Sequence, residues 1–140
     1  MSVGTGARRR GLGLGSSRGE RGSTSVQMVI LMPVLFSVMF LGLLAALFYH
    51  ARTVAIAAAQ EGARAAGAET GSASDGIAAA TSFIAAAGGS DVIENASVSG
   101  SRSATQATVI VRGAALSVIP GWRPIVQQSA TVPVERITTG

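Results

Sequence analysis

The chain contains no cysteine. This excludes disulfide bonds, thiol catalysis and cysteine-ligated metal sites, so a domain outside the cytoplasm would have to fold without covalent cross-links. All eleven basic residues are arginine, and aromatic residues make up only 4% of the sequence. Alanine supplies much of the 48% apolar fraction. A chain of 140 residues with this composition has room for one small domain with a thin core.

Residue types that catalyse reactions or bind cofactors are also scarce. The single histidine, His50, has no carboxylate or serine spaced to form a relay with it, and the seven carboxylates are not paired at metal-ligand or acid–base spacing. The glycine-rich stretch at residues 11–15 lacks the strand, helix and lysine of a phosphate-binding loop. We therefore expect no enzymatic activity, no catalytic residue, no cofactor, no metal site and no small-molecule substrate.

The net charge of +4 is distributed unevenly along the chain. Five of the eleven arginines and one glutamate lie before residue 26, whereas arginines and carboxylates balance after residue 48. A basic segment can indicate nucleic-acid binding. A flank beside a membrane span explains it better, because cytoplasmic flanks collect arginine and lysine. We expect residues 1–25 to form a basic, flexible cytoplasmic tail and expect no nucleic-acid partner.

Residues 26–48 form an apolar run without a charged side chain. About 20 apolar residues cross the hydrocarbon layer as a helix, so the run predicts one transmembrane helix in the lipid bilayer. The arginines before it predict a cytoplasmic N-terminus and residues 49–140 outside, with Tyr49 and His50 at the outer interface. A cleaved secretory signal is the alternative, with a small-x-small site at residues 57–59, but the apolar run is too long for one.

Pro33 lies inside this span. Membrane helices tolerate proline where neighbouring groups satisfy the freed carbonyl. The other interpretation is a functional kink, and the residue alone does not decide between the two.

The predicted helix continues beyond the membrane. Residues 49–67 contain no proline and are rich in alanine, the strongest helix former, so we expect one helix to about Gly67. One side of this extension is polar and includes Glu61 and Arg64, which can pair at i,i+3. The other side is a strip of small residues: Ala55, Ala58, Ala59, Gly62 and Ala66. Such a strip lets a second backbone approach closely; the alternative is an alanine-rich helix with one solvated face.

Residues 70–140 are expected to form a small α+β domain outside the membrane. Asp75 can cap a helix over residues 76–87, and three antiparallel strands are expected at residues 96–99, 105–112 and 128–137. Alternation predicts two inward faces, formed by Ala107, Val109 and Val111 and by Ala130, Val132 and Val134. Pro133 argues for an edge strand. Trp122, in a turn rich in proline and glycine, is expected to fill the small core.

Three features follow one another along residues 20–67. They are R-G-S-T-S-V-Q at residues 21–27, Pro33 inside the span, and A-A-Q-E-G-A-R-A-A at residues 58–66. Together they resemble the TadE-like family of membrane proteins, minor pseudopilins of tight-adherence (Flp-type) pilus systems. Members of that family look like R-G-S-x-x-V-E-F or V-E-M, an apolar run with an early proline, and A-A-x-E-G-A-R-A-A. The most specific part of this resemblance is the family motif formed by Glu61, Gly62, Ala63 and Arg64.

The resemblance implies a structural part of a pilus or secretion apparatus in the bacterial cell membrane, and not a catalyst. Its implied partners are other pilin-like subunits, an inner-membrane assembly platform and an assembly ATPase. The resemblance further implies lateral assembly through the N-terminal helix. A strip of small residues on a helix that is half in lipid suits such packing.

Gln27 departs from the family pattern, which has glutamate at this position. In pilin-type proteins that carboxylate is thought to meet the freed N-terminal amine of a neighbour. Gln27 accepts a hydrogen bond without carrying charge, and it is cheaper to bury in lipid than a carboxylate. Pilin-like processing would cut between Gly22 and Ser23, where glycine allows close approach of a peptidase. We expect Gln27, Pro33 and the strip to take part in helix packing during assembly.

Two classes of function therefore remain. The first is a pseudopilin-like component of a tight-adherence pilus or related secretion apparatus. The second is a single-pass anchored envelope protein whose outer domain binds an unidentified partner. Neighbouring genes for a secretion ATPase and a multi-span platform would favour the first class, and an isolated gene the second.

Overall fold

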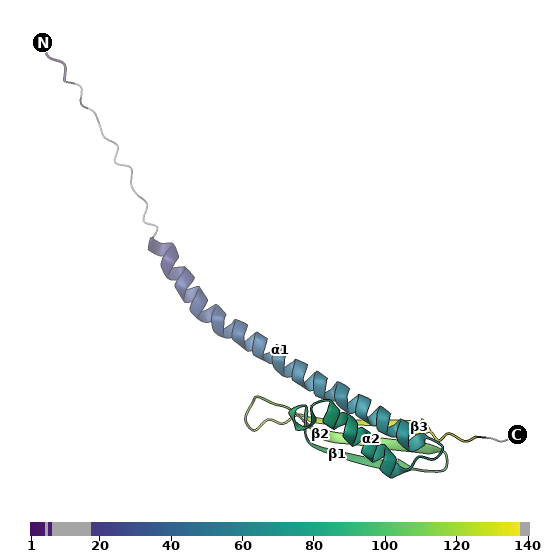
Figure 1. Ribbon diagram of the computed structural model, residues 1–140. Helices are drawn as coiled ribbons and strands as arrows, with labels where there is room; N and C mark the ends of the chain where they lie inside the picture. Colours follow the sequence, from purple (N-terminus) through teal and green to yellow (C-terminus); the bar gives the residue numbers. More distant parts are fainter. Residues whose placement is uncertain (5, 7–17, 138–140) are drawn as a thin grey trace. The chain divides into compact units, whose positions relative to one another are not determined.

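The computed structural model describes residues 1–4, 6 and 18–137, with the backbone alone for residues 18–23. The arginines at residues 8–10 and the glycine-rich stretch at residues 11–15 lie outside the described residues. The chain divides into two compact units, Met1–Val38 and Met39–Gly140 (the body). Helix α1 (Arg18–Gly67) contributes residues to both units (Figure 1).

In the first unit, α1 begins at Arg18, before the apolar run. Residues 18–25, expected as part of a flexible tail, are therefore helical. No proline interrupts them, and once a helix is nucleated each further residue adds one backbone hydrogen bond. Every residue from 24 to 38 is exposed, including the large apolar side chains of the run. Among the described residues, α1 is the one helix long and apolar enough over Thr24–Gly67 to cross a membrane.

Pro33 lies within α1, and the helix continues on both sides of it. Proline has no N–H, so it leaves one carbonyl in the preceding turn without its helical donor. Ser37 Oγ donates to the Pro33 carbonyl O at 2.7 Å, the pattern of a helical serine that bonds back to the turn before it.

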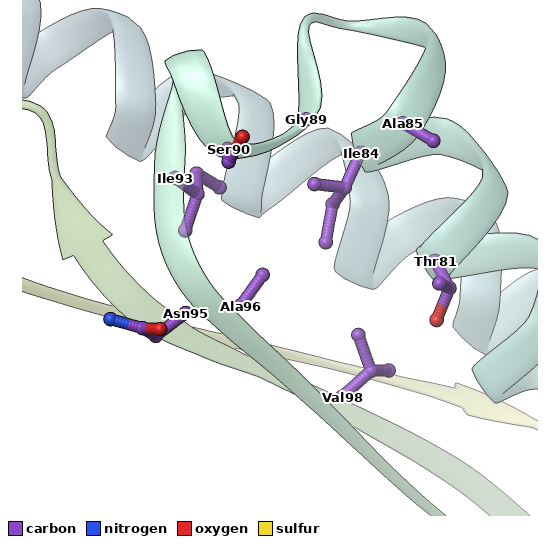
Figure 2. Close-up of a pocket in the computed structure, with 9 residues that line it drawn as sticks. All are labelled: Thr81, Ile84, Ala85, Gly89, Ser90, Ile93, Asn95, Ala96 and Val98. Carbon is purple, nitrogen blue, oxygen red and sulfur yellow. The ribbon is translucent and has the colours of Figure 1, made fainter.

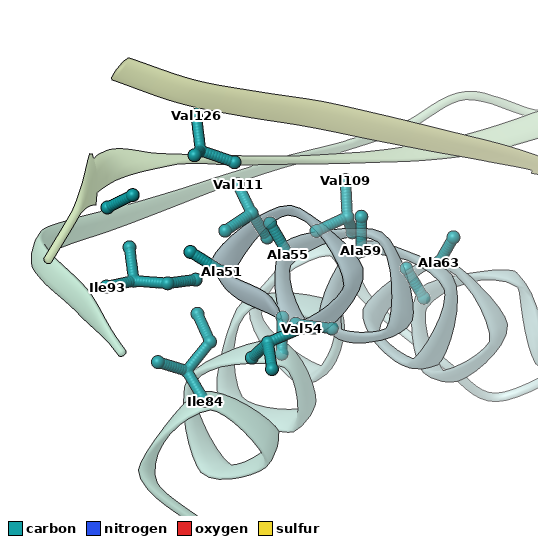
Figure 3. Packing of buried hydrophobic residues seen from close by; sticks show 14 of the residues in the cluster. Ala51, Val54, Ala55, Ala59, Ala63, Ile84, Ile93, Val109, Val111 and Val126 are labelled. Carbon is teal, nitrogen blue, oxygen red and sulfur yellow. The ribbon is translucent and has the colours of Figure 1, made fainter. Parts of the chain in front are cut away.

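The body places two helices against one antiparallel sheet, which confirms the expected α+β class. After α1 come α2 (Ala73–Ala86), a short 3₁₀ turn η1 (Gly89–Asp91), β1 (Ile93–Arg102), β2 (Gln106–Ala115) and β3 (Ile125–Pro133). The three strands lie in sequence order, β1-β2-β3, with β2 in the centre. Helices α1 and α2 lie on the same side of the sheet (Figure 3). β3 is an edge strand, as Pro133 indicates.

The boundaries of α2 and β3 differ from those expected from the sequence, because specific hydrogen bonds set where these elements begin. Ser72, not Asp75, is the N-cap of α2. The Asp75 N–H donates to Ser72 Oγ at 3.2 Å, and the Ser72 N–H donates to Asp75 Oδ2 at 2.8 Å, so the two residues form a reciprocal capping box. α2 therefore begins at Ala73, before the expected start at residue 76. β3 begins at Ile125 and ends at Pro133, because the whole strand pairs with β2 from Ala114 to Gln106.

The core is built from small side chains. Ile93, Val109 and Val111 are the largest side chains that are fully buried, and most other core residues are alanine. The predicted inward face of β2 is confirmed: Ala107, Val109 and Val111 are all 0% exposed. The expectation that Trp122 fills the core is wrong, because its side chain is 49% exposed. Trp122 lies in the turn between β2 and β3, and the core is filled by alanine, valine and isoleucine side chains.

The end of α1 is tied to the rest of the body by an arginine from β1. Arg102 Nη1 donates to the carbonyls of Ala66, Ala68 and Gly71, the Ala68 bond measuring 2.7 Å. Its Nη2 donates to the Glu69 carbonyl at 3.2 Å. The last carbonyls of a helix lack helical donors, and a cation is favourable there. α1 therefore ends at Gly67, as the sequence indicates, and Arg102 holds that end in place.

Candidate functional site

The family motif in α1 is divided between two environments. Gly62 and Ala63 are buried in the body, whereas Glu61 and Arg64 point to solvent. Glu61 Oε2 and Arg64 Nη1 are 3.4 Å apart, with 51% and 69% of their side chains exposed. The i,i+3 pair expected from the sequence is thus present. An exposed pair of this kind contributes little to stability, so the two charges are available to a partner.

The strip of small residues is covered completely. Ala55, Ala58, Ala59 and Ala66 are 0% exposed, and Gly62 is buried. They belong to one core with Ala80 and Ile84 of α2 and with the inward residues of β2 (Figure 3). A second backbone does approach α1 along the strip, but it is that of α2 in the same chain. This part of α1 is thus an alanine-rich helix with one face in solvent and the other packed in the body.

The closest approach of the two helices is a crossing of two glycines. A Cβ added to Gly62 would lie 2.6 Å from the Gly76 carbonyl O and 2.9 Å from Ala80 Cβ. A Cβ added to Gly76 would lie 2.7 Å from the Gly62 carbonyl O. Real Cβ atoms do not approach other atoms so closely, so both positions require glycine. Gly62 of the family motif therefore sets the distance between α1 and α2.

Gly76 and Arg102 are structural residues that the sequence patterns do not indicate. Gly76 stands near the start of α2, where glycine is unremarkable by composition. Arg102 lies in a polar stretch of β1 with no local partner. Both act through contacts with a different element, Gly76 with Gly62 and Arg102 with Ala66, and such contacts give no periodic signal in the sequence.

The predicted assembly residues of the first unit are exposed on α1. Gln27 and Pro33 both belong to the surface of the helix. Gly22 and Ser23, the expected cleavage position, have helical backbone, and their side chains lie outside the described part of the chain.

The body has a groove between α2 and β1 of about 260 Å³. Ile84, Ile93 and Val98 point toward it, with Thr81 and Ser90 at its edges (Figure 2). None of the residues that line it is titratable. Within the described ranges, no group of three histidine or carboxylate side chains is placed to hold a metal ion. The groove can bind an apolar group but offers nothing for acid–base chemistry.

Comparison with protein families finds a match for part of the chain. The family model described as TadE-like protein matches residues 22–64. No curated protein and no solved structure matches the chain. The matched segment contains the apolar run, Pro33 and the complete motif Glu61–Arg64, and the family is one of structural pilus components. Residues 22–64 are therefore similar to the TadE-like family that the motifs indicated, and this similarity implies a component associated with a tight-adherence pilus.

Proposed function

We propose that the chain is a pseudopilin-like structural subunit of a tight-adherence pilus or a related secretion apparatus. The observation that carries the proposal is the TadE-like match over residues 22–64. This segment contains the exposed apolar part of α1. With five arginines before the span, the N-terminus lies in the cytoplasm and residues 49–140 lie outside the bacterial cell membrane.

In this proposal, subunits associate laterally through α1 within the membrane. The strip around Gly62 is occupied by the body's own core, so it is not free for a neighbour. The exposed surface of residues 26–43, which includes Gln27 and Pro33, is the remaining contact surface on the span. Membrane helices associate through packing and interhelical hydrogen bonds. Other pilin-like subunits, the assembly platform and the assembly ATPase would meet the protein through this segment.

Processing between Gly22 and Ser23 belongs to the same proposal. The cut would remove the basic segment and leave a new amine four residues before Gln27. A charged amine is costly in lipid, and the side-chain carbonyl of Gln27 in a neighbouring chain can accept its hydrogen bond. Gln27→Leu should then impair assembly more than membrane insertion. The intact mass of the membrane-extracted protein reports the cut directly, and a major form that retains residues 1–22 would exclude it.

Cysteine cross-linking tests the lateral contact, because the chain has no cysteine of its own. Single variants Val29→Cys and Phe36→Cys, both exposed on the span, should form disulfide-linked dimers in cells that express the assembly system. Ala59→Cys, which is buried in the body, is the matched control and should not cross-link. Absence of dimers at every span position would contradict lateral assembly through α1. A periplasm-dependent reporter fused after Gly140 should be active, and a cytoplasm-dependent one inactive.

The second candidate is an anchored envelope protein whose body binds an apolar partner. The groove between α2 and β1 is the observation that favours it. A substitution in the groove, such as Ala85→Trp, would then abolish binding of the apolar partner, while cross-linking through the span continued. Under the pseudopilin proposal, the same substitution should leave assembly unchanged.

A further inference from the structure

The loop that joins β2 to β3, residues 116–124, displays large apolar side chains to solvent. Val118, Ile119 and Trp122 are 46%, 39% and 49% exposed. The Trp122 N–H donates to the Ile119 carbonyl O at 3.2 Å, and Gly121 between them has φ 80°. A type II turn with proline and then glycine at its centre has this geometry. The apolar side chains are therefore held outward by an ordered turn.

This loop lies at the end of the sheet that is beside Ala51 of α1. The residue before the loop pairs with Ile93, and Ile93 shares a cluster with Val126 and Ala51 (Figure 3). At the opposite end of the sheet, a Cβ on Gly67 would lie 2.6 Å from Val132 Cγ2. The sheet thus extends beside α1 from Ala51 to Gly67. The β2–β3 loop leaves it at the Ala51 end.

The body also covers α1 inside the apolar run. Leu44 is 7% exposed, although Leu41 and Leu43 on the same helix are 63% and 51% exposed. Leu44, Phe48 and Ala51 follow the i, i+4, i+7 spacing of one helix face. Since α1 alone leaves its leucines half exposed, another part of the body must cover Leu44. The body therefore reaches about 6 Å into the run, which ends at Phe48.

Two connections lie at this end of the body, and they differ in chemistry. Residues 88–92, between α2 and β1, are small or polar except for a half-buried valine, and they include Asp91. The β2–β3 loop has the exposed tryptophan and two exposed aliphatic side chains, with Arg123 beside them. Tryptophan is enriched where a membrane meets water. Arg123 Nη1 lies 3.2 Å from Glu94 Oε2, so the positive charge beside the loop is paired within the body.

We propose that the β2–β3 loop is a second membrane contact of the protein, with Val118, Ile119 and Trp122 seated in the headgroup region of the outer leaflet. The inference rests on the proposed membrane span of α1. Its occupant is a lipid surface, because the loop displays three large apolar side chains at the end of the sheet beside Ala51, three residues after the apolar run ends at Phe48. A helix alone leaves the body free to rotate about its axis. A second contact fixes which face of the body is turned toward neighbouring subunits.

Trp122 is the one tryptophan of the chain, so its fluorescence reports this loop alone. The full chain is reconstituted into vesicles of phosphatidylcholine and phosphatidylglycerol, with and without bromine on the acyl chains near the headgroups. The brominated lipid should quench Trp122 emission, and acrylamide should quench it weakly. Val118→Ser together with Ile119→Ser should shift the emission to longer wavelength and reduce quenching by bromine. Ile137→Ser, which changes an exposed isoleucine after β3, is the matched control and should leave both values unchanged.

Carbonate extraction of the same vesicles separates the two proposals. If the chain is extracted, α1 does not span the bilayer and both proposals fall. If the chain stays inserted while acrylamide quenches Trp122 and brominated lipid does not, the loop faces water and this inference alone is overturned. Shielding of Trp122 from both quenchers, present only at high protein-to-lipid ratio, would assign the loop to a second copy of the chain and would equally overturn the lipid contact.

Discussion

Substituting Gly62 by alanine should destabilise the body, although alanine is the better helix former. In an open helix the substitution stabilises by about 0.5–1 kcal/mol. At Gly62 the new Cβ would lie 2.6 Å from the Gly76 carbonyl O, 2.9 Å from Ala80 Cβ and 3.0 Å from Val109 Cγ1. Overpacking of a core costs about 1–3 kcal/mol. Because a helix backbone cannot rotate out of the way, we expect a net loss of about 1–2 kcal/mol in the free energy of unfolding.

Pulse proteolysis of the detergent-extracted full chain across a urea series measures this loss as a shift in the unfolding midpoint. Gln60→Ala is the matched control, since it changes the exposed side of α1 close to Gly62 and should shift stability by less than about 0.5 kcal/mol. Gly42→Ala provides a second control. A Cβ at Gly42 meets nothing within 4 Å, so this substitution should not destabilise.

The crossing also predicts coupling between its two glycines. Gly76→Ala should destabilise similarly, because its Cβ would lie 2.7 Å from the Gly62 carbonyl O. Once one substitution has moved the helices apart, the second should cost less, so the double variant should lose less than the sum. Stability of Gly62→Ala at or above wild type would refute the reasoning. If Gly62→Leu abolished assembly while the body remained as stable as wild type, the strip would face another subunit after all.

Three further variants test the remaining contacts by the same urea assay. Arg102→Ala should lower the free energy of unfolding by about 2 kcal/mol, because hydrogen bonds from a charged group contribute about 1.5–3 kcal/mol. Arg102→Lys should recover only part of this loss, because lysine lacks the planar guanidinium. Equal stability of wild type and Arg102→Ala would show that the Arg102 hydrogen bonds to the end of α1 do not stabilise the body. Ser72→Ala should lose about 1 kcal/mol through the α2 N-cap, whereas an unchanged midpoint would show that Asp75 alone caps the helix. Glu61→Gln should change the free energy of unfolding by less than about 0.5 kcal/mol, since its pair with Arg64 is exposed. A larger loss would show that the Glu61 carboxylate stabilises the fold of the body.

Local sequence determined most of the secondary structure. An uncharged apolar run specifies a long helix, and alanine without proline carries that helix on to Gly67. Alternation in β2 predicted its buried face, and Pro133 indicated that β3 lies at an edge. These signals come from neighbouring residues, whose spacing fixes which side chains share a face. The TadE-like motif also lies within α1, and it can be recognised in the sequence because its residues are neighbours along the chain.

Only the tertiary structure decided what the small-residue strip packs against. Alanine and glycine on one helix face show that a backbone comes close, but they have no side chain that could specify which backbone it is. The answer depends on Gly76 and Arg102, which come from distant elements: Gly76 meets Gly62 across the helix crossing, and Arg102 ties β1 to the end of α1. The exposure of Trp122 was decided in the same way. A large apolar residue is buried only where the fold brings other elements over it, and the turn between β2 and β3 leaves Trp122 at the surface.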